Sequence, residues 1–61
     1  MQHLWVSAKN PPKEEGRYFV LTDQPIPHME IASYLFDMWV NNDNVVIKVS
    51  AYDANKVRAE L

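Results

Sequence analysis

The sequence has no cysteine and a single glycine, and each shortage excludes a class of function. Without cysteine, the chain can form neither a disulfide nor a thiolate metal site. One glycine, Gly16, is too few for the glycine-rich loops that cradle phosphate groups. No apolar run approaches the roughly 20 residues that cross a membrane as a helix, so the sequence predicts no membrane span.

The charged residues are of mixed sign, and the net charge is small. Eight acidic and six basic residues give a net charge of −2. This is too little for a basic footprint on nucleic acid, and too little for an acidic mimic of DNA. The first residues lack the charged start and long apolar stretch of a secretory signal. Together with the absence of cysteine, these features lead us to expect a cytoplasmic protein, in the host cell if it is phage-encoded.

The length predicts one small β-rich domain over residues 1–61. A chain this short buries only about 60% of the surface that its unfolded form exposes. With disulfides excluded, tight aromatic packing or association with a partner must supply further stability. Two Trp, three Tyr and two Phe are available for packing. We therefore expect contact with a protein partner or with a second copy of the chain, as in a homodimer.

Three segments are rich in β-branched and aromatic residues and are bounded by turn formers. They predict strands over 17–22, 28–36 and 38–40. Pro25 and Pro27 cannot donate backbone hydrogen bonds and place a loop between the first two strands. Strands joined by short turns pair as an antiparallel meander.

The second half of the chain begins with the strongest turn signal, Asn41 to Asn44. Residues 45–52 then alternate between apolar and polar side chains, which predicts a half-buried strand. Asp53 is suited to cap a helix over 53–61, although nine residues are marginal for a helix. The predicted fold is therefore mainly β, a small three- to four-stranded antiparallel meander with a short C-terminal helix or tail.

The two faces of the predicted sheet are both apolar, so we expect a cover on each side. The N-terminal segment around Trp5 is one candidate cover and the C-terminus is the other. Residues 10–16, with two prolines, a short acidic stretch and Gly16, predict a single helical turn that leads into the first long strand.

Five short segments between Trp5 and Trp39 follow one another in an order that resembles a family of small phage and prophage proteins, the domain-of-unknown-function family numbered five hundred and fifty-one. The likeness covers about residues 5 to 50. The resemblance implies a phage or prophage origin and a small β-meander, and it brings no known activity and no functional residues. The matching pieces are Trp5-Val6-Ser7, Pro12 with Glu14 and Gly16, Tyr18-Phe19-Val20-Leu21, Ala32-Ser33-Tyr34 and Trp39.

Four aromatic residues are the candidate protein-binding residues: Trp5, Tyr34, Phe36 and Trp39. Packing in the core is the alternative role, because so small a chain needs its aromatics inside. Phe36 and Trp39, beside a tight turn, are the pair that we expect to lie exposed as interface anchors.

A second candidate site is the basic group Lys48, Lys56 and Arg58. Beside an aromatic side chain these cations could hold phosphates and stack bases, as in a small nucleic-acid-associated protein. Solvated faces of a strand and a tail are the alternative. A self-assembling structural protein is the third function that the sequence leaves open.

No pattern predicts an enzyme, a cofactor, a metal or a small-molecule substrate. There is no nucleophile elbow and no zinc-binding helix motif. His3 and His28 are isolated, whereas zinc sites bring together four ligands. Residues 41–44 carry one carboxylate, whereas a calcium site needs several. The leading hypothesis is thus a non-enzymatic protein-binding module, phage-encoded and acting on a host protein.

Overall fold

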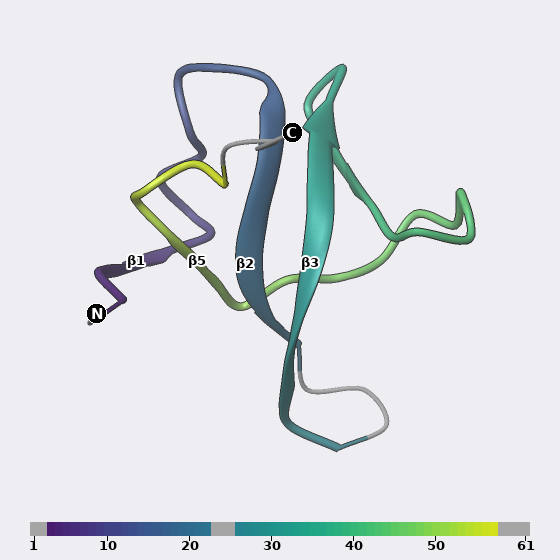
Figure 1. Ribbon diagram of the computed structural model, residues 1–61, viewed down its shortest axis with the longest axis horizontal. Coiled ribbons are helices and arrows are strands. Elements are labelled where there is room, and N and C mark those ends of the chain that lie inside the picture. Colours follow the sequence, from purple (N-terminus) through teal and green to yellow (C-terminus); the bar gives the residue numbers. More distant parts are fainter. Residues whose placement is uncertain (1–2, 23–25, 58–61) are drawn as a thin grey trace.

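The computed structural model describes residues 3–22 and 26–57, which form a single antiparallel sheet of five strands (Figure 1). In the sheet, the strands follow the order β1-β5-β2-β3-β4. None of the described residues forms a helix that could span a membrane. The strands are β1 (Trp5–Ser7), β2 (Gly16–Thr22), β3 (His28–Leu35), β4 (Met38–Val40) and β5 (Ala51–Asp53).

The hairpin of β2 and β3 is the centre of the sheet. Its register runs from Gly16 opposite Tyr34 to Thr22 opposite His28. Gly16 begins β2 at a φ of +153°, and a Cβ at this position would collide with the side chain of Lys56. Glycine therefore suits the start of this strand because of its backbone conformation, whereas the end of the flexible Lys56 side chain can move aside.

The prediction of a mainly β, antiparallel fold is confirmed. The strands expected over 17–22, 28–36 and 38–40 correspond to β2, β3 and β4. Only these three follow one another as a meander, because the chain then crosses the sheet and inserts β5 between β1 and β2. The sheet has five strands since β1 and β5, of three residues each, extend it beyond β2.

The strand expected over 45–52 is mostly wrong. Only Ala51 and Tyr52 of this segment lie in a strand, and Val46 makes one isolated bridge to Val40. The alternation has another cause, because residues 41–50 form a connection that crosses from β4 to β5. Along it Ile47 and Val49 pack against the core while the polar residues between and after them stay exposed.

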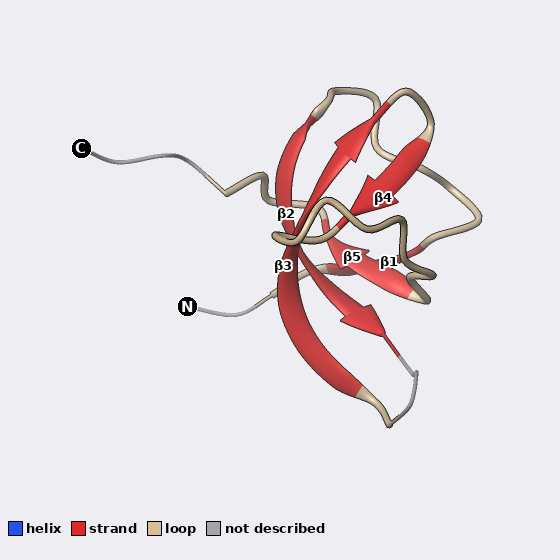
Figure 2. Cartoon of the chain, turned by 90° about the vertical axis from the view of Figure 1, so that its right-hand side faces the viewer, coloured by secondary structure: helices blue, strands red, loops and turns tan. Residues whose placement is uncertain are grey.

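The core lies between the curved sheet and this crossing connection (Figure 2). Alternate residues of β2, β3 and β4 point to this side, which we call the inner face. The Trp39 ring packs with its centroid 5.7 Å from that of Tyr18 and 5.6 Å from that of Tyr52. The buried hydrophobic residues are Tyr18, Val20, Ala32, Tyr34, Trp39 and Tyr52.

The N-terminal cover that the sequence predicted does not form, and part of the predicted C-terminal cover lies outside the described residues. The N-terminal segment joins the sheet as β1 and does not lie across it, whereas the 41–50 connection covers the inner face. Residues 10–15 form no helical turn, and Asp53 ends β5 rather than starting a helix. Its Oδ1 accepts hydrogen bonds from the amides of Leu4 and Asn55, and its Oδ2 lies 2.6 Å from His3 Nδ1. Residues 58–61 of the predicted helix lie outside the described residues.

Candidate protein-binding surface

The turn between β3 and β4 presents the most exposed aromatic side chain of the described residues. Register pairs Leu35 with Met38, so the loop between the strands has two residues, Phe36 and Asp37. Both have positive φ, 50° and 63°, as in a type I′ turn. The Phe36 side chain is 79% exposed. We call Leu35, Phe36 and Met38 the hairpin tip.

The backbone at the hairpin tip is fixed by two acidic side chains. Glu15 Oε2 accepts a hydrogen bond from the Phe36 amide at 3.0 Å. Tyr34 donates its hydroxyl proton to Asp37 Oδ1 at 3.4 Å. Burial, followed by the charge of Asp37, raises the pKa of the Tyr34 phenol, so this hydroxyl keeps its proton to higher pH. The exposed ring is thus carried on an ordered turn.

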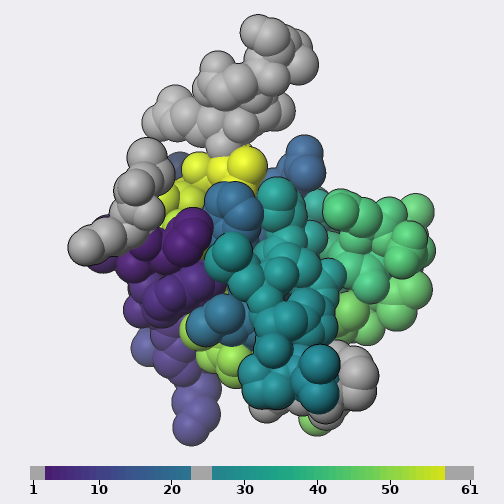
Figure 3. All heavy atoms as spheres, turned by 60° about the horizontal axis from the view of Figure 1, so that its bottom comes forward, coloured from purple at the N-terminus to yellow at the C-terminus, as the bar shows by residue number. Residues whose placement is uncertain are grey.

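The opposite side of the sheet, the outer face, is apolar as well. Register places Phe19 opposite Ile31 and Leu21 opposite Met29, and all four point away from the core. None of the described segments covers them as 41–50 covers the inner face. Figure 3 shows side chains of β2 (blue), β3 (teal) and the N-terminal segment (purple) meeting in one continuous surface. The apolar outer-face residues are Trp5, Phe19, Leu21, Met29, Ile31, Leu35, Met38 and Val40.

One corner of the outer face holds the buried carboxylate of Asp53, which is paired with the His3 ring. The His3 ring lies over Asp53, with Nδ1 2.6 Å from Asp53 Oδ2. Its centroid is 5.2 Å from that of Trp5 and 5.0 Å from that of Phe19. Burial raises the pKa of Asp53, but hydrogen bonds from the Asn55 amide, His3 and the Leu4 amide outweigh it and hold the pKa below its ordinary value.

The four aromatic candidates separate into two pairs. Phe36 is exposed, as predicted, and Trp5 is 39% exposed on the outer face. The exposure predicted for Trp39 is wrong. Trp39 and Tyr34 lie in the core, because the 41–50 connection covers the face to which both belong. The surface therefore offers Trp5 and Phe36 to a partner, and not all four.

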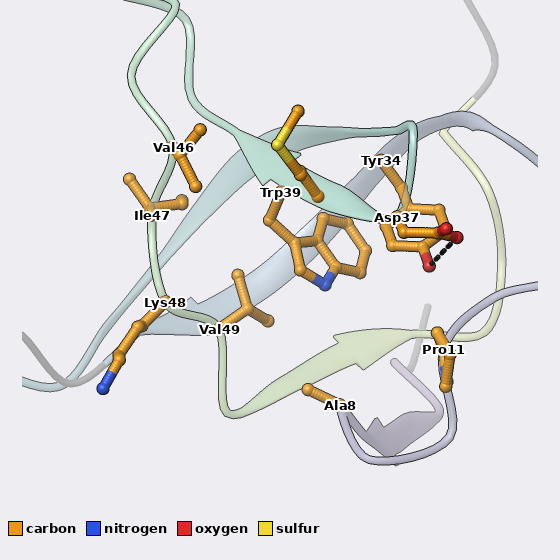
Figure 4. A pocket seen from close by; sticks show the side chains of 10 residues that line it. Ala8, Pro11, Tyr34, Asp37, Trp39, Val46, Ile47, Lys48 and Val49 are labelled. Carbon is orange, nitrogen blue, oxygen red and sulfur yellow. Dashed lines mark hydrogen bonds between the residues drawn. The ribbon is translucent and has the colours of Figure 1, made fainter.

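A groove of about 500 Å³ runs beside Trp39, between the hairpin turn and the crossing connection (Figure 4). Tyr34 and Trp39 contribute its aromatic lining, and Val49 packs below the indole. Its acidic group, Asp37, already accepts the Tyr34 hydroxyl proton. The Lys48 side chain points away from the indole. The groove is thus a mostly apolar hollow that opens at the edge of the core, with little polar chemistry directed into it.

The predicted basic group is not a cluster. Lys48 lines a hollow with Thr22, at the end of β2, whereas Lys56 contacts Gly16, at its start. Seven residues of strand separate these ends by about 20 Å. Lys56 Nζ also lies 3.2 Å from Glu14 Oε1, which offsets its charge. The third residue, Arg58, lies outside the described residues.

The residues whose oxygen or nitrogen atoms could ligate a metal ion mostly form hydrogen bonds within the chain. Within 3–22 and 26–57, no three His, Asp or Glu side chains gather closely enough to hold a metal ion. Asn41 Oδ1 accepts the amides of Asp43 and Val45, so this oxygen shapes the turn. His28 lies beside the Ile26 carbonyl and Glu30, contacts that in this order raise its pKa.

No protein-family model, curated protein or solved structure matches this chain. The candidate surface therefore rests on the residues themselves. Sequence reasoning missed the outer face as a site, although the signal was present. Alternation in 17–21 and 29–35 places apolar side chains on both faces of one hairpin, and only one of them can pack against a single connection.

Proposed function

We propose that this protein is a non-enzymatic protein-binding module and that the hairpin tip is its anchor. The observation that carries the proposal is Phe36, a large aromatic side chain that is 79% exposed on a backbone with positive φ. Bulky residues are genuine outliers in this region of backbone space. Such strain concentrates at functional positions.

The fold itself gains little from a phenylalanine at this position. Asn or Gly is favoured where both central residues of a two-residue hairpin need positive φ. A residue with a Cβ costs about 1 kcal/mol or more in the left-handed region. Since the Phe36 ring is mostly in solvent, its packing does not offset this cost. A partner that buries the ring would.

The surroundings of Phe36 indicate what such a partner presents. Leu35 and Met38, 36% and 41% exposed, extend the apolar contact on either side of the turn. Glu15 and Asp37 place carboxylates beside it. A complementary partner therefore has an apolar pocket with basic side chains at its rim.

The proposal includes a phage or prophage origin, a host protein as partner and action in the host cytoplasm. Its support is the order of the sequence pieces that resemble small phage proteins, together with the small size and the absence of a recognisable reaction motif. Within residues 3–22 and 26–57, no structural observation favours the nucleic-acid alternative, because Lys48 and Lys56 lie near opposite ends of β2.

The experiment is a tagged pull-down from bacterial lysate with and without nuclease, read by mass spectrometry. Wild type is compared with Phe36→Asn and with Phe36→Ala. Val45→Asn is the matched control, because Val45 is also an exposed apolar residue, at 54%, but lies outside the hairpin tip. Urea denaturation of each variant separates loss of the anchor from loss of the fold.

We expect Phe36→Asn to be more stable than wild type by about 1 kcal/mol, because it relieves the turn. It should nevertheless recover at least tenfold less of a discrete partner, while Val45→Asn recovers the wild-type amount. Unchanged recovery with both Phe36 variants would refute the anchor. Recovery that disappears with nuclease would instead support the nucleic-acid alternative.

A further inference from the structure

The central part of the outer face combines apolar character with an absence of charge. The outward residues of β3 are Met29, Ile31, Ser33 and Leu35, none of them charged. On β2 the outward residues include Phe19 and Leu21, and Arg17 is the charged one, near the start of the strand.

The inner face alone gives this chain a thin core. Of the buried hydrophobic residues, only Val20 is completely enclosed. Folded domains consist of at least two layers because a sheet with an apolar face must bury it. Here one layer is the sheet and the 41–50 connection covers one side of it. An apolar second face of this extent is typical of an interaction surface.

We propose that a second copy of this chain covers the outer face, so that two sheets pack face to face in a symmetric sandwich. This goes beyond the proposed function, since it uses Ile31 in the middle of the face and Met29 near the start of β3 rather than Phe36. Two aligned sheets pack about 10 Å apart, with their outward side chains interdigitated between them. The arrangement is isologous, the same patch meeting itself across a two-fold axis.

Size favours a second copy as the occupant. The molecule measures 31 × 24 × 22 Å, so the face of a sheet in it can bury no more than about 700 Å² in projection. A standard interface buries about 800 Å² on each partner. Two copies paired through this face would bury up to about 1,400 Å² in total, which is within the roughly 1,200–2,000 Å² of a specific, stable interface.

Charge favours the same occupant. Each copy carries a net charge of −2, but the middle of the outer face carries none of it. A pairing centred on Phe19 and Ile31 therefore buries no charge in its middle, while the exposed Arg17, at the start of β2, stays at the rim in water. Asp53, at the corner of the face, is already engaged by His3 and two amides, so it needs no partner from the other copy.

The experiment is sedimentation equilibrium of the full chain from about 1 µM to 1 mM, a range that covers weak and moderate association. The expected mass rises with concentration towards twice 7.1 kDa. Met29→Arg places a charge on the face, near the start of β3, and should weaken the dimer at least tenfold. Val45→Arg is the control and should dimerise like wild type, because Val45 lies on the crossing connection.

Three outcomes would overturn the inference: a wild type with the mass of one chain throughout, a dimer that Met29→Arg leaves unchanged, or equal weakening by both variants. Circular dichroism in dilute solution checks that each variant is folded. If Met29→Arg does not fold, Met29→Gln serves the same comparison with a smaller expected effect. Failure here leaves the anchor role of Phe36 intact, since the pull-down detects a different partner.

Discussion

The two faces of this sheet are built from the same strands and are both apolar, yet one is buried and the other is partly exposed. On the inner face, Val20 and Ala32 are almost completely buried. On the outer face, their immediate neighbours in sequence, Leu21 and Ile31, stay partly exposed. Strand composition is therefore not what distinguishes core from surface here. The difference comes from one connection, residues 41–50, which crosses one side and not the other.

The largest expected effect contrasts the two tryptophans, one on each face. Trp39→Ala should cost about 3–5 kcal/mol of unfolding free energy, because it leaves a cavity among Tyr18, Tyr34 and Tyr52. Trp5→Ala should cost about 1 kcal/mol or less, since its side chain already faces solvent on one side. Urea denaturation in dilute solution measures both. Equal losses would show that the two faces contribute alike.

If Trp39→Ala prevents folding, Trp39→Phe compared with Trp5→Phe preserves the contrast with smaller losses. Both variants keep an aromatic ring, so they differ mainly in the volume removed from each face.

This contrast also explains how much of the fold could be predicted. Runs of β-branched and aromatic residues identified β2, β3 and β4, because such residues fit a pleated, half-buried surface wherever the strand lies. Alternation in 45–52 identified which side chains pack, namely Ile47 and Val49, but not that the segment crosses the sheet instead of joining it. Periodicity shows which side chains of one segment share a face, whereas strand pairing depends on how the rest of the chain is arranged.

The candidate site, too, could be predicted from the sequence only in part. The exposure of Phe36 could be predicted because a two-residue turn projects its residues from the sheet. For Trp39 the sequence left core packing and exposure both open, because both faces are apolar and only the crossing connection decides which one is closed. The pairing of His3 with Asp53 joins residues fifty positions apart and leaves no local pattern in the sequence.

Asp53 is an exception to the difference between the two faces. It is a polar residue on the outer side, yet at 3% exposure it is as buried as the residues of the inner core. Asp53→Asn should cost about 2 kcal/mol at neutral pH, since the carboxylate accepts three hydrogen bonds that a neutral amide cannot all replace. Asp43→Asn, an exposed acid in the 41–44 turn, is the matched control and should change stability little.

The pH dependence of this effect has a definite sign. The pKa of Asp53 is lower in the folded chain than its ordinary value of about 4. Its stabilising contribution is therefore fully present above that ordinary value, and it is lost as pH falls through the lower folded pKa. Urea denaturation between about pH 2 and pH 7 should show wild type and Asp53→Asn converging at the acid end. A constant difference would mean that Asp53 acts by packing and not by charge.

The smallest expected effect is on the outer face, at Met29, which is 48% exposed. In dilute solution Met29→Thr should change the unfolding free energy by less than about 0.5 kcal/mol, as exposed substitutions usually do. At high concentration a dimer stabilises the wild type by mass action, so its thermal midpoint rises while that of Met29→Thr rises less. The contribution of the outer face to stability then depends on protein concentration, because this face is buried only where a second copy is present. A Met29→Thr midpoint that follows wild type at every concentration would mean that the outer face stays open to solvent.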